Sequence, residues 1–130
     1  VTPYEGIPEM LKALKDKGIQ LAVLSNKPDR QTVKVVKAIF GEELFDYAQG
    51  QKEGIRRKPE PDGVWYLMEQ MHVSKEECLY IGDSEVDAAT GRNAGLKTIG
   101  VLWGFRDRKT LETAEVDDLI DRPDELLQFV

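Results

Sequence analysis

The alternation of short apolar runs with amphipathic segments is the feature that most constrains how this chain can fold. Residues 78–81 form an apolar run, residues 86–93 form a helical segment, and residues 98–102 form a second apolar run. Strand, helix and strand in this order make a βαβ unit, whose crossover joins parallel strands with right-handed winding. The pattern therefore predicts the α/β class, with helices covering both faces of a parallel sheet.

The remaining segments extend this alternation over the chain. Apolar residues at Ile7, Met10, Leu11 and Leu14 form a helical stripe, and Gly18 suits the end of that helix. Helices are predicted at residues 7–15, 28–40, 61–71, 86–93 and 121–130, and strands at residues 20–24, 45–50, 78–81, 98–102 and 116–120. We expect residues 1–130 to form one domain, because a chain of this length supports one core and leaves no room for a second.

Charge and cysteine content limit the partners and the location that we expect. The net charge is -6, and residues 56–58 are the only dense basic cluster, which argues against nucleic-acid binding. Cys78 is the only cysteine, so no intrachain disulfide can form, in agreement with a reducing cytoplasm. No apolar run reaches the length of a membrane span. We therefore expect a cytoplasmic protein that binds neither nucleic acid nor a membrane.

The apolar run at residues 78–81 ends at Gly82 and is followed by two carboxylates, Asp83 and Asp87, four residues apart. Asp83 is expected on the loop that leaves the strand and Asp87 in the first turn of the next helix. Both side chains can then reach one divalent cation at the carboxyl end of the sheet. A Gly-Asp turn before a helix is also ordinary capping chemistry, because Asp accepts hydrogen bonds from unpaired N–H groups. The motif alone leaves both interpretations open.

Two other segments place polar groups where a phosphate could bind. The predicted strand at residues 20–24 ends at Ser25 and Asn26, which offer a hydroxyl and backbone N–H groups to a phosphate oxygen. Lys58 stands directly before Pro59, which restricts it to an extended conformation and holds one cation in a defined place. Taken singly, the first segment favours a turn and the second a solvated charge run. Their order, followed by the acidic motif, indicates one common site.

These motifs resemble those of the haloacid dehalogenase-like hydrolases, most closely the phosphoglycolate phosphatase-like branch. The second motif of the family, a strand followed by Ser or Thr, is similar to residues 21–27. The third, Lys before Pro, is similar to residues 58–59, and the fourth, Gly-Asp-x-x-x-Asp, to residues 82–87. Residues 88–95 and 101–106 also resemble the segments that follow in this branch. The resemblance covers nearly the whole chain and implies a three-layer α/β/α Rossmann-like parallel sheet.

The first motif of the family, Asp-x-Asp-x-Thr, does not occur in these 130 residues. That motif supplies the nucleophilic aspartate and the general acid. Residues 1–7 resemble the point where these proteins return from a helical cap domain into the core, so we expect the C-terminal part of a longer phosphatase, inactive alone. In the family the missing strand lies between the strands that end at Ser25 and Asp83. Direct pairing of these two strands, strand exchange in a homodimer, or an upstream segment is expected to fill its place.

For an intact parent, the resemblance implies hydrolysis of a small phosphorylated metabolite through an aspartyl-phosphate. Ser25 and Lys58 would be the catalytic residues present here. Ser25 and the backbone of Asn26 would hold phosphate oxygens, and Lys58 would bind and neutralise the phosphoryl group. Asp83 would ligate Mg²⁺, and Asp87 would complete the metal site directly or through water.

Two alternatives to a phosphatase stay open. A regulatory module could bind Mg²⁺ and phosphate without turnover, which would agree with the absent nucleophile. A receiver-like signalling domain would combine an acceptor aspartate with a lysine. The receiver is the weaker alternative, because such domains gather their acids near the N-terminal strand, whereas here Asp83 and Asp87 follow both other motifs.

Overall fold

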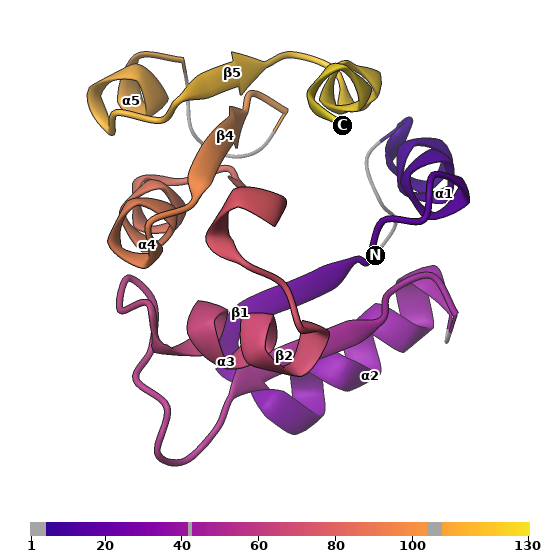
Figure 1. Cartoon of the computed structure of the whole chain (residues 1–130), viewed down its shortest axis with the longest axis vertical. Helices are drawn as coiled ribbons and strands as arrows, with labels where there is room; N and C mark the ends of the chain where they lie inside the picture. The colour runs from indigo at the N-terminus through magenta and orange to yellow at the C-terminus, as the bar shows by residue number, and fades with distance from the viewer. Residues whose placement is uncertain (1–4, 42, 104–107) are drawn as a thin grey trace. The chain divides into compact units, whose positions relative to one another are not determined.

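The computed structural model describes residues 5–41, 43–103 and 108–130 (Figure 1). It divides into two compact units, Val1–Ile55 with Pro123–Val130, and Arg56–Arg122. Each unit contains its own sheet, and every strand pair in both sheets is parallel. The predicted α/β class is therefore confirmed, but the strands belong to two sheets rather than to one.

The first unit is a parallel strand pair with helices. Its elements are α1 (Ile7–Asp16), β1 (Ala22–Pro28), α2 (Asp29–Phe40), β2 (Tyr47–Gln51) and the 3-10 helix η2 (Pro123–Phe129). α2 packs against both strands, and α1 packs against η2 (Figure 1). The stripe predicted for the first helix is the face that α1 buries, through Met10, Leu11 and Leu14.

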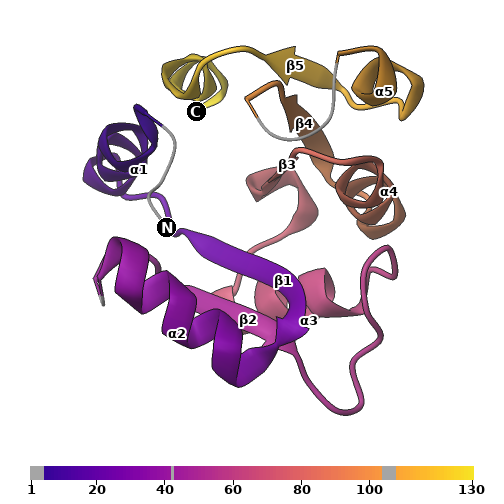
Figure 2. The ribbon, with the colours of Figure 1, turned by 180° about the vertical axis from the view of Figure 1, so that it is seen from behind.

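The second unit is a three-stranded parallel sheet in which β4 is the middle strand. Its elements are α3 (Asp62–Met71), η1 (Lys75–Glu77), β3 (Leu79–Gly82), α4 (Glu85–Ala94), β4 (Lys97–Val101), α5 (Arg108–Thr113) and β5 (Asp118–Ile120). α4 connects β3 to β4 and packs against both (Figure 2). The predicted βαβ unit is thus confirmed, with each of its boundaries shifted by one residue.

The core of the second unit lies around the middle strand, against which α4 packs, and α5 packs in turn against α4. Ile99 of β4 and Leu111 of α5 have no exposed area. Gly91 lets α4 approach β4 closely, because a Cβ at this position would overlap the hydroxyl of Thr98. Thr98 is itself buried and donates from its hydroxyl to the carbonyl of Leu96 at 3.1 Å. A side chain at position 91 would therefore push the helix away from the sheet.

β1 continues past its predicted end at Leu24. Its pairing with β2 is regular up to Leu24 and resumes only at Pro28, so residues 25–27 lie opposite the single residue Gly50. The Ser25 hydroxyl accepts a hydrogen bond from the N–H of Lys27 at 3.1 Å. The polar residues that favoured a turn therefore form a bulge inside the strand.

Three further features differ from the predicted elements. η1 and α5 were not expected, and the predicted closing helix is the shorter 3-10 helix η2. Residues 1–4 and 104–106, which contribute to the family resemblance, lie outside the described residues. Within the described ranges, no helix has the length and apolar character needed to cross a membrane.

Within each unit, the strands that flank the missing strand in the family have one partner each. In the part of the chain that the structure describes, β1 pairs only with β2, and β3 pairs only with β4. Which of the three expected solutions fills the position of the missing strand stays a prediction, because β1 and β3 belong to different units. Both strands keep one edge without a strand partner among the described residues.

Candidate functional site

The two carboxylates of the acidic motif lie where the sequence predicts. Asp83 follows β3 directly, and Asp87 is the third residue of α4. Ser84 is the N-cap of α4, and its hydroxyl accepts a hydrogen bond from the N–H of Asp87 at 3.2 Å. Because Ser84 caps the helix, neither aspartate is its N-cap residue.

Asp87 forms an ion pair with Lys58. The Lys58 Nζ lies 2.8 Å from Asp87 Oδ1, and each side chain is only 14% exposed. Lys58 precedes a cis peptide bond to Pro59, in a loop that joins the first unit to α3. The limited exposure strengthens the attraction between the two charges, because little water screens them. The structure therefore brings together the third and fourth motifs.

The second carboxylate oxygen of Asp87 also accepts hydrogen bonds. Asp87 Oδ2 accepts hydrogen bonds from the N–H of Asp83 at 3.2 Å and from the hydroxyl of Ser84 at 3.3 Å. A Cβ on Gly82 would overlap the side chain of Asp87, so the glycine makes room for the carboxylate. Asp87 is thus held in one position by the loop that leaves β3.

Tyr80 is a further member of this cluster that the sequence did not indicate. Its hydroxyl donates to Asp87 Oδ1 at 3.4 Å. Burial, together with the nearby charge of Asp87, raises the pKa of Tyr80 far above its ordinary value, so the hydroxyl stays protonated and can donate. Strand alternation offered a signal, because it places Tyr80 and Gly82 on the same face of β3.

Asp83 and Asp87 are the carboxylates that could ligate Mg²⁺ at this site. The described residues contain no group of three or more His, Cys, Asp or Glu side chains that could hold a metal ion. Mg²⁺ keeps several waters and needs only one or two carboxylates, so this finding agrees with its usual coordination. Within the described part of the chain, the carboxylate of Asp83 makes no hydrogen bond or ion pair, whereas both oxygens of Asp87 do. The residues fit the ion, with Asp83 as the more available ligand.

Ser25 and Asn26 belong to the first unit, whereas Lys58, Asp83 and Asp87 belong to the second. Ser25 is partly buried in the bulge of β1, where its oxygen accepts from the N–H of Lys27 and its own hydrogen can still be donated. That the two groups share one phosphate site stays a prediction.

Arg56, two residues before Lys58, pairs with acidic side chains close to it in the sequence. The Arg56 guanidinium forms two hydrogen bonds of 3.0 Å with the carboxylate of Asp62, and it lies 3.5 Å from Glu60. Arg56 is 68% exposed. This part of the basic trio therefore behaves as a solvated charge cluster, while Lys58 is withdrawn into the site.

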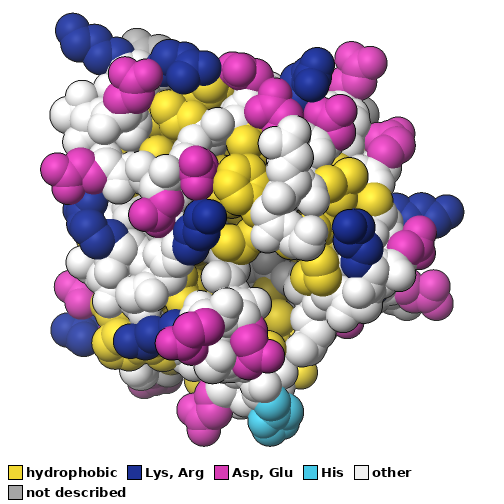
Figure 3. Space-filling model, turned by 45° about the horizontal axis from the view of Figure 1, so that its top comes forward, with side chains coloured by type: hydrophobic (Ala, Val, Ile, Leu, Met, Phe, Trp, Pro, Cys, Tyr) yellow, Lys and Arg dark blue, Asp and Glu magenta, His cyan; other side chains and the backbone are white. Residues whose placement is uncertain are grey.

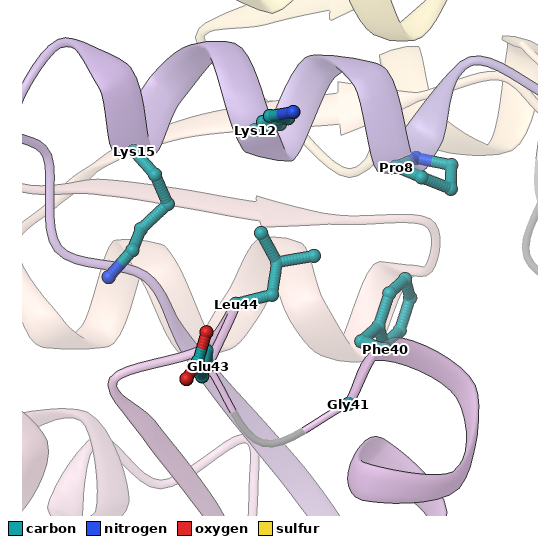
Figure 4. A pocket seen from close by; sticks show the side chains of 7 residues that line it. All are labelled: Pro8, Lys12, Lys15, Phe40, Gly41, Glu43 and Leu44. Carbon is teal, nitrogen blue, oxygen red and sulfur yellow. The ribbon is translucent and has the colours of Figure 1, made fainter.

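A separate hollow lies in the first unit (Figure 4). It is lined by Pro8, Lys12, Lys15, Phe40, Gly41, Glu43 and Leu44. None of the motif residues contributes to it, and Lys15 is already paired with Asp46 at 2.9 Å. The hollow is therefore distinct from the candidate site.

Parallel strands with polar residues at their carboxyl ends define the class of this chain, an α/β protein of the Rossmann-like type. Residues 1–101 match the family described as Haloacid dehalogenase-like hydrolase. The chain belongs to the haloacid dehalogenase-like hydrolases, as its three motifs predicted.

Similar proteins of this family include a phosphoglycolate phosphatase and a pyrophosphatase. The chain is 34% identical over 128 residues to the phosphoglycolate phosphatase of Aquifex aeolicus, covering 98% of this chain and 59% of that protein. It is 30% identical over 130 residues to the pyrophosphatase PpaX of Halalkalibacterium halodurans, covering 100% of this chain and 60% of that protein. This chain thus spans about three fifths of the length of these relatives.

Solved structures agree with this relationship. One of them is described as a phosphoglycolate phosphatase from Lactobacillus delbrueckii subsp. bulgaricus. It superposes on this chain with a TM-score of 0.94 at 39% sequence identity, and the match covers 98% of this chain and 53% of that one. A predicted phosphatase from Clostridium acetobutylicum gives a TM-score of 0.87 at 28% identity, covering 97% of this chain and 58% of that one.

Proposed function

We propose that this chain is part of a Mg²⁺-dependent phosphomonoester hydrolase that acts on a small phosphorylated metabolite. The observation that carries the proposal is the largely buried pair of Lys58 and Asp87 beside Asp83, at the carboxyl end of β3. A lysine fixed by a carboxylate in this place can hold an anion at a defined position. The 34% sequence identity to the phosphoglycolate phosphatase of Aquifex aeolicus also supports phosphomonoester hydrolysis.

Each motif residue has a distinct part in this proposal. Lys58 neutralises charge on the phosphoryl group, while Asp87 holds its ammonium group in place. Ser25 and the backbone of Asn26 bind phosphate oxygens. Asp83 ligates Mg²⁺, which, when bound, offsets the negative charge that develops during phosphoryl transfer. Asp87 would complete the metal site directly or through water, and the hydrogen bonds that its oxygens already accept favour the second of these.

We further propose that the substrate is a small phosphate compound rather than a nucleic acid. The named relatives point to phosphoglycolate and to pyrophosphate. On the face shown in Figure 3, basic and acidic side chains are interspersed, which does not favour a polyanion. The single cysteine supports our inference of a cytoplasmic location.

Release of inorganic phosphate tests this function. The 130-residue chain, and the same chain joined to a segment with the Asp-x-Asp strand, are given phosphoglycolate, pyrophosphate and an aryl phosphate, with and without Mg²⁺. We expect no turnover by the chain alone and Mg²⁺-dependent turnover by the joined protein. Asp83→Asn should abolish that turnover, whereas Asp16→Asn, an exposed aspartate on α1, should not change it.

Other outcomes would favour a different function. Turnover by the chain alone would mean that one of its own carboxylates is the nucleophile. Mg²⁺-dependent phosphate binding without turnover by the joined protein would support a non-catalytic module. A stable aspartyl-phosphate on Asp83 would support the receiver-like alternative.

A further inference from the structure

α4 holds the lysine loop at a second point besides Asp87. The Nδ2 of Asn93, near the end of α4, donates to the carbonyl oxygen of Pro59 at 2.9 Å. Pro59 follows Lys58 directly in the chain. One helix therefore contacts both the side chain of the lysine and the backbone beside it.

The loop around Lys58 depends on such contacts for its position. Residues 56–61 lie in no helix or strand. Pro59 has no N–H group, so its carbonyl is the only backbone hydrogen-bonding group with which this residue can be anchored. The bond from Asn93 supplies that anchor.

We propose that Asn93 is a positioning residue for Lys58. By fixing the carbonyl of Pro59, it sets the backbone from which the lysine side chain extends to Asp87. The consequence for catalysis rests on the proposed function, whereas the anchoring of the loop does not. A small displacement of a group that holds the phosphoryl oxygens lowers the rate of transfer, because catalysis depends on the placement of charge within about 1 Å.

Chemical labelling of the lysine tests the anchoring without any assay of activity. Acetic anhydride acetylates accessible amines, and mass spectrometry gives the rate at Lys58 relative to half-exposed Lys97 in the same unit. We expect Asn93→Ala to raise this ratio by about three-fold to ten-fold, the factor that corresponds to one lost hydrogen bond. Global unfolding would instead raise both rates, so the ratio separates the two effects.

Arg92→Ala is the matched control. Arg92 is the neighbouring residue on the same helix, and it donates to the carbonyl of Ala114 at 3.0 Å, away from the lysine loop. Its loss should leave the ratio unchanged. Asn93→Leu, which keeps the approximate size of the side chain, should behave like Asn93→Ala. The proposal is overturned if either Asn93 variant leaves the ratio unchanged, or if Arg92→Ala raises it equally.

A second experiment measures the steady-state kinetics of the chain joined to the Asp-x-Asp segment. Asn93→Ala should lower kcat by about ten-fold with little change in KM, since the displaced charge acts mainly on the transition state. A change in KM alone would contradict the positioning role. If the joined protein shows no turnover at all, the proposed function fails, while the labelling ratio still decides whether Asn93 anchors the loop.

Discussion

At the scale of single residues, one carboxylate organises the candidate site. Asp87 accepts from Lys58 and Tyr80 through one oxygen, and from Asp83 and Ser84 through the other. These four donors leave Asp87 little freedom to turn toward another ligand. The two aspartates of the motif are therefore not equivalent, and we expect their substitution to have different effects.

Asp87→Asn keeps the size of the side chain but removes the charge that balances Lys58. Because the lysine is only 14% exposed, we expect the free energy of unfolding to fall by about 3 kcal/mol, as measured by urea denaturation. Asp118→Asn is the control, since its pair with Lys97 spans 3.6 Å and is about half-exposed, so it should cost less than about 1 kcal/mol. Equal losses in both variants would contradict a special role for the Lys58 pair.

At the scale of elements, Asp46 connects the start of β2 to two other segments. Its carboxylate accepts from the N–H of Leu21 at 2.7 Å and from the Lys15 ammonium of α1 at 2.9 Å. Burial would raise the pKa of Asp46, but the hydrogen bonds from Lys15 and Leu21 outweigh it and hold the pKa below its ordinary value of 3.8. The ionised form of Asp46 therefore stabilises the first unit.

This shift predicts a dependence of stability on pH. The contribution of Asp46 is fully present above its ordinary pKa of 3.8, and it is lost as the pH falls through the lower pKa of the folded state. At pH 7 we expect Asp46→Asn to reduce the free energy of unfolding by about 1 kcal/mol. The difference from the unchanged chain should shrink below about pH 4, as measured by thermal unfolding across pH. A difference that stays constant down to pH 2 would show that the charge of Asp46 is not responsible.

The success of prediction from sequence also varies between elements. The βαβ unit of the second sheet was predictable because its apolar runs and its helix have clear periods. α5 was not, since Leu111 is its only buried residue and its sequence contains no apolar stripe. The contact of Asn93 with the lysine loop was also not predictable, because it depends on how α4 packs against a segment that is distant in sequence. For Tyr80, only the alternation of side chains along β3 offered a signal. Ser25 was predicted just after the end of the strand, but it lies inside β1, because the bulge lets the strand continue to Pro28.

At the scale of the whole molecule, the open edges of β1 and β3 are the main feature. Among the described residues, each strand has a partner on one side only. An unpaired backbone group costs about 1–3 kcal/mol when it is buried away from water. A strand that pairs with either edge should therefore stabilise the chain.

Hydrogen exchange measures this effect. When a segment with the Asp-x-Asp strand is joined to the chain, we expect slower amide exchange in β1 and β3, because their free edges gain hydrogen bonds. β5, the other edge of the three-stranded sheet, serves as the internal control and should change less. Equal slowing in β3 and β5 would indicate general stabilisation rather than pairing at the open edge.

α4 contacts the lysine loop twice, through Asp87 and through Asn93, and this restricts insertions and deletions within the helix. Asp87 and Asn93 are six residues apart on one helix, and each residue turns the helix by about 100°. A single insertion or deletion between them would rotate Asn93 away from the carbonyl of Pro59 while Asp87 stayed on Lys58. We therefore expect these two turns of α4 not to tolerate a change of length.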